Sequence, residues 1–529
     1  SNEKQPDGSD EDPDEYQVDL GAASFVAGSL AVLSERFRGQ LSGRELALRL
    51  VNTADQDIFY DDDTLLTGTP HPTEDEVNDP AMAGEVERKE RERREAVSET
   101  YGAGLIDLEA ASEVIGEEVV RIPSSSASRN KPASAVATYT ATKVTTSPAF
   151  GDGLALALYD REIVTFDEWD APFWRPLSWL VSTSTNRRSL LERREGASAS
   201  GARFVPLEDG GLLAFTTYQD DKLFSDDRGS GRWAERYRDD DLAQEHKIEL
   251  SLRQPVDDGF ETELLFATGR IAELPLGLNA EQDFTHPYLG FAGEGVGAGG
   301  SMALGAGRVT ALGFSGSQDE GEETYAAHGG LLEYSFAPSP SLKIGMQTGA
   351  LIEEERALGL RSSGAFGKIG ATSTVFAGVS VEGELDANWR FRAQALGGRA
   401  NLSAPSVGLV DDFSGVATSA FRLGIEGFGL LRESDEFSLF VSQPLRVESG
   451  SVALVVPVGR TRDGALLSER IEGVSLAPGG REIEVSARYE FNLTSDLALG
   501  FDAGIVRDGG HIRAQAIEFY GLGDLHFHF

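Results

Sequence analysis

The feature that most restricts the fold of this chain is an alternation of apolar and polar side chains after about residue 245. In the segment REIEVSARYEF, every second residue is apolar and most residues between them are charged. Segments near residues 342, 389 and 497–505 repeat the pattern, often with glycine in place of the charge. Successive side chains of a strand point to opposite faces, so each segment predicts a β-strand with one apolar face. Alternation over about ten residues fits a tilted strand that crosses a bilayer. In the first segment the apolar face carries Ile483, Val485, Ala487, Tyr489 and Phe491.

The spacing of such segments predicts about 12 strands and the way they are connected. The connections alternate between tight turns and longer loops, provided that 450–458 counts as part of a loop at 447–480. Short turns at one rim and long loops at the other are typical of bacterial outer-membrane barrels, and an even strand number lets a sheet close without an exposed edge. We therefore predict a mainly β fold with a C-terminal antiparallel β-barrel. The strands are expected at 260–269, 298–305, 307–316, 329–337, 341–350, 372–382, 388–399, 416–430, 437–446, 481–491, 496–506 and 519–529.

The last five residues, LHFHF, agree with this prediction. Leu525, Phe527 and Phe529 share one face of the final strand. Outer-membrane proteins commonly end on an aromatic residue that the assembly machinery recognises, so Phe529 predicts that partner together with outer-membrane lipid. A soluble sheet can also end in this way. The alternative is therefore a soluble, acidic, all-β binding protein whose apolar faces pack on each other.

The charge balance and residue counts exclude several other classes. There are 47 Lys and Arg residues against 87 Asp and Glu, for a net charge of −40, and we find no local basic patch. Binding to a nucleic-acid backbone is therefore not expected. There is no cysteine, which excludes disulfides and thiolate-ligated metals. No segment has the 18 or so uninterrupted apolar residues of a transmembrane helix.

Composition divides the chain into four predicted segments. The first is an acidic arm with almost no apolar residues, which predicts disorder. The second has helical periodicity, a capping box formed by Ser42 and Glu45, and a charged insertion. The third begins rich in Ser, Thr and Ala and predicts a linker or β region, and the fourth is the barrel. The boundaries are 1–17, 18–121 with the insertion at 59–99, 122–244, and 245–529.

Two features of these segments could have a binding role. Carboxylates such as those of the arm are ligands that calcium takes, but EF-hand spacing is absent and a solvated tail is the simpler interpretation, so we expect no cofactor. The charged stretch GRWAERYRDDDLAQEHK, at 231–247, is compatible with a helix that fills a narrow barrel lumen.

Three ordered passages in the first 112 residues, AASFVAGSLAVL, RELALRLVNTAD and YGAGLIDLEAAS, carry a resemblance. They resemble the C-terminal part of the subtilisin-like serine protease domain, in which a nucleophilic serine opens a buried helix. SPAFGDGLALAL, FDEWDAPF and the stretch at 457–485, together with a C-terminal barrel, look like the autotransporter branch of that family. In that branch a secreted protease unit is joined to an outer-membrane translocator.

The residues depart from the family at the point that matters for catalysis. Leu20 occupies the position of the nucleophilic serine, and leucine cannot attack a carbonyl carbon. Ser24 and Ser29 lie beyond that position. The family's Asp and His motifs are not found, and His328-Gly329 begins a predicted strand. We therefore predict no catalytic residue and no proteolysis by this chain as it stands. The alternative is a secreted or surface serine endopeptidase, acting on proteins, whose Asp, His and Ser lie in upstream sequence.

Other candidates for chemistry have simpler interpretations. His526 and His528 share one face of the last strand and could hold a metal weakly, but a pair facing the lumen is the simpler interpretation. The stretch GFAGEGVGAGG lacks the flanking pattern of a nucleotide loop and is interpreted as barrel glycine. Arg460, Arg462 and Arg470 could line a pore or contact lipopolysaccharide phosphate, but ordinary loop ion pairs are the simpler interpretation.

Taken together, the sequence predicts an outer-membrane protein of the autotransporter type, located at the bacterial cell surface. Its barrel would anchor and translocate a partial subtilisin-like peptidase unit.

Overall fold

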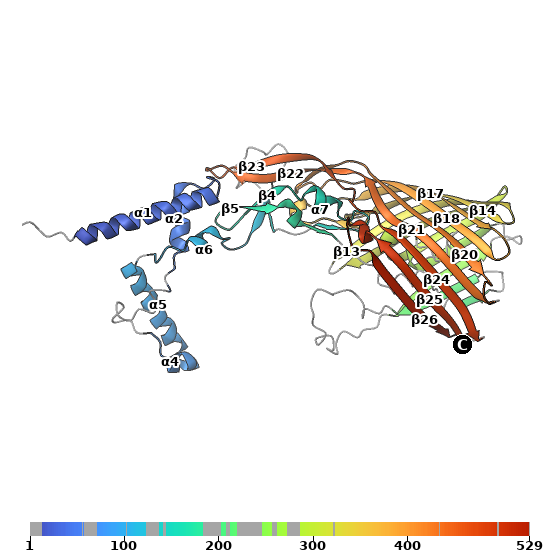
Figure 1. Cartoon of the computed structure of the whole chain (residues 1–529), viewed down its shortest axis with the longest axis horizontal. Helices are drawn as coiled ribbons and strands as arrows, with labels where there is room; N and C mark the ends of the chain where they lie inside the picture. Colours follow the sequence, from blue (N-terminus) through green and yellow to red (C-terminus); the bar gives the residue numbers. More distant parts are fainter. Residues whose placement is uncertain are drawn as a thin grey trace, which may run out of the picture. The chain divides into compact units, whose positions relative to one another are not determined.

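The computed structural model describes residues 13–55, 57, 71–101, 103–122, 137–140, 144–183, 203–207, 212–219, 246–255, 262–271, 286–320, 323–432, 434–494 and 497–527 (Figure 1). The chain forms two compact units, neither of them continuous in sequence. The first contains residues 1–141, 162–175 and 456–469, and the second contains the remainder. Within the described residues, no helix has the length and apolar character needed to cross a membrane.

The second unit is built on one antiparallel sheet of 15 strands. Neighbours in the sheet follow the order of the chain, because each strand returns beside the one before it. Figure 1 shows a curled sheet whose strands run at a tilt. They are β7 (Arg203–Pro206), β8 (Leu212–Gln219), β9 (His246–Pro255), β10 (Thr262–Arg270), β11 (Glu294–Leu304), β12 (Gly307–Glu320), β13 (Glu323–Ser339), β14 (Leu342–Glu353), β17 (Thr372–Glu384), β18 (Trp389–Asn401), β20 (Val416–Phe428), β21 (Asp435–Ser449), β24 (Ile483–Thr494), β25 (Leu497–Arg507) and β26 (Glu518–Phe527).

The predicted fold class, mainly β with a C-terminal antiparallel sheet of the barrel type after a small α-rich unit, is confirmed. All twelve predicted strands are present, as β10 to β26 of this sheet. Three further strands, β7 to β9, precede them and were missed. The segment 450–458 is correctly excluded, because it forms a strand of another sheet. The helix predicted to fill the lumen, at 231–247, is wrong for its last two residues, because His246 and Lys247 belong to strand β9. Its remaining residues, 231–245, lie outside the described residues.

The two ends of the sheet differ in their connections. At one end, called the short-turn end, the chain turns tightly at 305–306, 340–341 and 385–388. At the other, the long-loop end, it leaves the sheet for longer segments such as 354–371 and 450–482. The predicted alternation of short and long connections is therefore confirmed, with 321–322 a short exception at the long-loop end.

The two faces of the sheet also differ, and β17 shows how. Thr372, Thr374 and Phe376 are buried on the inner face, whereas Val375 and Val379 are exposed on the outer face. The same alternation on other strands leaves an outer belt of exposed apolar side chains. Its members include Leu264, Phe266, Val296, Met302, Leu304, Leu332, Met346, Ile352, Leu423, Ile425, Val485, Phe501, Ile505, Phe519 and Leu525.

Small elements gather at the long-loop end of the same unit, except that residues 456–469 of the last hairpin belong to the first unit. One sheet has the order β15-β16-β3-β6, and a second has the order β19-β22-β23. Short helices connect and flank them. These elements are β3 (Val144–Thr146), α7 (Gly153–Ala157), η4 (Leu177–Leu180), β6 (Val181–Thr183), η8 (Leu289–Ala292), β15 (Arg356–Ala357), β16 (Leu360–Arg361), η9 (Gly364–Phe366), β19 (Val410–Phe413), β22 (Ser451–Arg460), β23 (Leu466–Ser475) and η10 (Gly509–His511).

The first unit is α-rich with a small sheet of order β2-β1-β4-β5. Its core packs Leu33 and Phe37 against Leu46, Leu50 and Phe173. The capping box of Ser42 and Glu45 is formed. The unit contains α1 (Pro13–Arg36), α2 (Gly43–Asn52), α4 (Glu74–Asn78), η1 (Pro80–Met82), α5 (Ala83–Tyr101), α6 (Leu108–Ser112), β1 (Val119–Ile122), β2 (Ala137–Thr140), β4 (Glu162–Phe166) and β5 (Pro172–Pro176).

Two boundary predictions change with the structure. Residues 13–17, predicted to be part of the disordered arm, form the first turn of α1, whereas 1–12 lie outside the described residues. The first unit also takes in 162–175 and the tip of the β22–β23 hairpin, 456–469, which the four-segment division had placed elsewhere. Asp167 pairs with Arg49 across 118 positions, and Arg460 pairs with Glu45 across 415. Contacts over such separations leave no local pattern in the sequence.

Candidate functional site

The candidate site is the long-loop end of the large sheet, where a turn at 147–153 is fixed to three other segments. Asp152 accepts hydrogen bonds from the backbone N–H of Gly479 at 2.8 Å and of Arg513 at 2.7 Å. The N–H of Val447 donates to the carbonyl of Ala149 at 2.8 Å. A side chain at Gly151 would meet backbone oxygens at 2.8 Å, so only glycine permits this approach. The turn is therefore tied to β21 and to the loops after β23 and β25.

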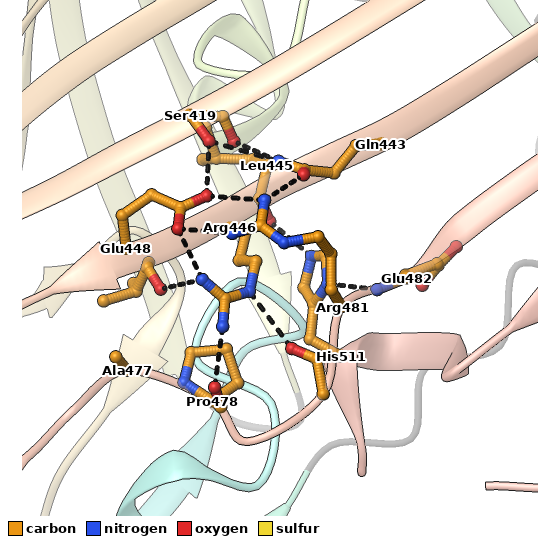
Figure 2. A network of polar contacts seen from close by, with 12 residues as sticks. Ser419, Gln443, Leu445, Arg446, Glu448, Ala477, Pro478, Arg481, Glu482 and His511 are labelled. Carbon is orange, nitrogen blue, oxygen red and sulfur yellow. Dashed lines mark hydrogen bonds and ion pairs between the residues drawn. The ribbon is translucent and has the colours of Figure 1, made fainter. Parts of the chain in front are cut away.

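A pair of arginines around one glutamate fixes these segments to the sheet (Figure 2). The Arg446 guanidinium donates to the carbonyls of Gly480 at 3.1 Å and Pro478 at 2.7 Å, and to Glu448 at 2.6 Å. Arg481 donates to the same Glu448 at 2.7 Å. Charge-assisted bonds of this kind are shorter and stronger than neutral ones, and Arg446 is almost fully buried. The network therefore anchors these segments to β21.

His511 completes the anchor and is fixed in one tautomer. Its Nδ1 accepts a hydrogen bond from the N–H of Glu482 at 2.8 Å, so Nε2 carries the proton and donates to the carbonyl of Leu445 at 3.1 Å. Burial, aided by the positive charges of Arg446 and Arg481, lowers the pKa of His511 to about 4. The ring is therefore neutral at physiological pH and serves as a structural link.

The stability of the second unit should fall as the pH drops from about 6.5 to about 4. Unfolded His511 takes up a proton near its ordinary pKa of 6.5, whereas the folded residue does so only near 4. The unfolded state therefore binds more protons in this window, at a cost of about 1.4 kcal/mol per pH unit for one group. In His511→Gln, the urea concentration at the unfolding midpoint should therefore depend less steeply on pH than in the wild type. The remaining pH dependence would come partly from His286, whose pKa burial also lowers to about 4.

The matched control for this measurement is His328→Gln, at an exposed position on the outer face of β13. An unchanged slope in His511→Gln together with a wild-type midpoint at pH 7 would contradict a neutral, buried His511.

As far as the structure describes them, the nucleophile-region residues and the histidine pair singled out in the sequence lie in two separate elements. Leu20 lies within α1, as do exposed Ser24 and buried Ser29. His526 lies in β26, and His528 lies outside the described residues together with Phe529. In the part of the chain that the structure describes, no cluster of three or more His, Asp or Glu side chains could hold a metal ion.

The three loop arginines form separate contacts, as the simpler interpretation expected. Arg460 is buried in the first unit, where it donates to Glu45 at 2.8 Å and to the carbonyl of Asp170 at 2.8 Å. Arg462 donates to the carbonyl of Gly39 at 3.0 Å. Arg470, in the second unit, pairs with Asp411 and Glu472. A single phosphate or pore site formed by all three is therefore not supported.

The anchor residues themselves were missed by the sequence analysis. The passages SPAFGDG and APGGREIEV were noted only for their resemblance, although they contain Asp152, the Gly479 N–H that donates to it, and Arg481. The two hydrogen bonds of Asp152 cross 327 and 361 residues, a separation that no periodicity reports. The abundance of glycine, proline and aspartate in the two passages was the one available signal of a tightly built turn.

Comparison with known proteins gives no family assignment. No family model matches the chain, and no curated protein matches it. Among solved structures, OmpT of Vibrio cholerae aligns with 61% of this chain and 100% of its own, at 9% identity and a TM-score of 0.32. OprB of Pseudomonas putida covers 53% of this chain and 72% of its own, at 12% identity and a TM-score of 0.32. OprD of Pseudomonas aeruginosa covers 59% and 77%, at 10% identity and a TM-score of 0.27.

Proposed function

We propose that this chain is an outer-membrane protein of the autotransporter type, whose large sheet crosses the membrane and anchors the α-rich unit at the cell surface. The observation that carries the proposal is the outer belt. Monomeric soluble proteins rarely expose apolar patches that continue over many strands, and lipid contact removes the cost of such exposure. Glycine and charged or polar side chains on the other face suit a polar lumen.

Aromatic side chains on the outer face at the short-turn end support the same proposal. Outer-membrane barrels carry aromatic girdles where lipid meets water, because an aromatic ring suits both environments. Here Tyr334 and Phe336 have ring centroids 5.8 Å apart, Trp389 and Phe437 are 6.4 Å apart, and Tyr489 and Phe491 are 5.7 Å apart. Each pair lies within a few residues of a short turn, as a girdle at one membrane surface requires.

The second role that we propose for the sheet is to hold the first unit at the cell surface, through the anchor at the long-loop end. The covalent connections between the two units, near residues 142, 162, 176, 456 and 470, all belong to segments at that end of the sheet. Asp152 and Arg446 hold these segments in place. Long loops face the cell exterior in bacterial barrels, so the covalent connections to the first unit would emerge on that side of the membrane. The assembly machinery, acting through Phe529, remains the proposed partner in membrane insertion.

The experiment is flotation of the refolded full chain with phospholipid vesicles, together with gel migration before and after boiling. We expect the protein to float with the vesicles and to migrate faster before boiling, as folded barrels do. Recovery as a detergent-independent soluble monomer would overturn the proposal in favour of the soluble all-β alternative. Labelling of the intact gene product, with any upstream sequence included, by a fluorophosphonate probe tests the endopeptidase alternative. We expect no labelling, whereas labelling of the upstream part would favour the endopeptidase.

A further inference from the structure

A segment between β10 and β11 lies on the inner face of the large sheet. The ring of Tyr288 stacks on Phe376, with centroids 4.6 Å apart and planes within 4°. The Tyr288 hydroxyl is hydrogen bonded to Oγ1 of Thr418 at 2.8 Å. Phe376 and Thr418 both belong to the buried set of their strands, on the face opposite the apolar belt.

The order of the strands shows how far this segment reaches. Going from β11, strand β17 is the fourth neighbour and β20 is the sixth. Helix η8, in the same segment, packs against β12, β13 and β14. The segment 286–293 therefore spans the inner surface of consecutive strands from β12 to β20. In a sheet curled into a barrel, that position is inside the lumen, near the long-loop end.

The segment is fitted to the wall with little free space. A side chain at Gly398 on β18 would lie 2.6 Å from the Tyr288 hydroxyl, so glycine makes room for the ring. Arg356 donates to the carbonyl of Phe291 at 3.1 Å. His286 is fully buried, and its ring lies 5.2 Å from that of Phe376. An aromatic stack, two polar contacts and a matched glycine are features of a docked element.

We propose that residues 286–293 form an internal constriction that closes the barrel lumen to ions and small polar solutes. The inference rests on the proposed membrane barrel, because only a membrane-inserted sheet has a lumen that separates two solutions. A docked segment of bulky side chains narrows a pore in the same way as other hydrophobic constrictions, by excluding water. Release of Tyr288 from its stack would open the path.

Ion conductance across planar lipid bilayers tests the proposal, with the full chain and three variants. Tyr288→Ala removes the stack and the hydrogen bond, and Gly398→Val places a side chain where the hydroxyl lies. Gly397→Val is the matched control, because that glycine is on the outer face and the nearest atom to an added Cβ is 3.6 Å away. We expect low conductance for the wild type and the control, and a several-fold rise for the other two variants.

Deuterium uptake of the peptide 286–293, measured in detergent, accompanies the conductance. We expect slow exchange in the wild type and fast exchange in Tyr288→Ala. Equal conductance of wild type and Tyr288→Ala, although exchange shows that the segment has been released, would overturn the constriction. Fast exchange already in the wild type would overturn it too, and this second readout does not need a membrane. Failure of every variant to float with vesicles would refute the proposed membrane function instead.

Discussion

Arg49→Leu should unfold the α-rich unit at urea concentrations that leave the large sheet intact. The Arg49 side chain is only 1% exposed and donates to the carboxylate of Asp167 at 2.7 Å and to the carbonyl of Ala111 at 2.6 Å. Its guanidinium also lies over both neighbouring rings, 5.1 Å from the centroid of Phe37 and 5.7 Å from that of Phe173. Its loss leaves the fully buried Asp167 without its charged partner, which costs about 3–5 kcal/mol.

Pulse proteolysis across a urea series measures this effect, because cleavage of the α-rich unit can be followed separately in the full chain. Arg44→Leu, on the exposed face of the same helix, is the matched control and should keep the wild-type midpoint. A midpoint for Arg49→Leu equal to that of the control would show that the buried pair contributes little to the fold of this unit.

Val379→Arg should prevent the sheet from folding into lipid vesicles. Val379 lies on the outer face near the middle of β17 and is 52% exposed. An arginine at the bilayer midplane of an outer-membrane barrel costs roughly 2–4 kcal/mol, and the cost falls toward the interfaces. In a soluble sheet the same change would place a charge in water at almost no cost. The size of the effect, large in a bilayer and close to zero where this face meets water, therefore separates the two interpretations of the outer belt.

Gel migration without boiling, after refolding in vesicles, reports the folded fraction. Ser373→Arg is the control on the same face of the same strand, because Ser373 lies at the long-loop end, where an arginine can reach water. We expect the control to fold and Val379→Arg to remain largely unfolded. Equal folding of both variants would argue against a lipid-facing belt.

The candidate site shows where sequence reasoning stopped. The alternation in REIEVSARYEF correctly predicted β24 and its apolar outer face, because successive side chains of a strand point to opposite faces of the sheet. The Arg446 anchor was not foreseen, because it joins a strand to loops about 30 residues away and to a turn about 300 residues away. Hydrogen bonds between irregular segments leave no period to detect.

The N-terminal resemblance illustrates a second limit. The passage AASFVAGSLAVL forms a helix, as expected, yet Phe25, Val26 and Val32 are exposed on α1. Whether a helix is buried depends on what packs against it, and local sequence specifies only that it is helical. The comparisons leave the subtilisin-like and autotransporter assignments as proposals that the labelling and flotation experiments test.

The sequence by itself determined the antiparallel strands, the face that each one turns outward and the alternation of short and long connections, because these depend on residues close in the chain. Only the tertiary structure decided that β7 to β9 extend the sheet, that 162–175 and 456–469 join the α-rich unit, and that Tyr288 crosses the inner face to Phe376 and Thr418. The physical reason is that such contacts are selected by shape and by the pairing of buried polar groups across long separations. Alternation in the sequence fixes which face a side chain occupies, but leaves open the distant residue that it meets there.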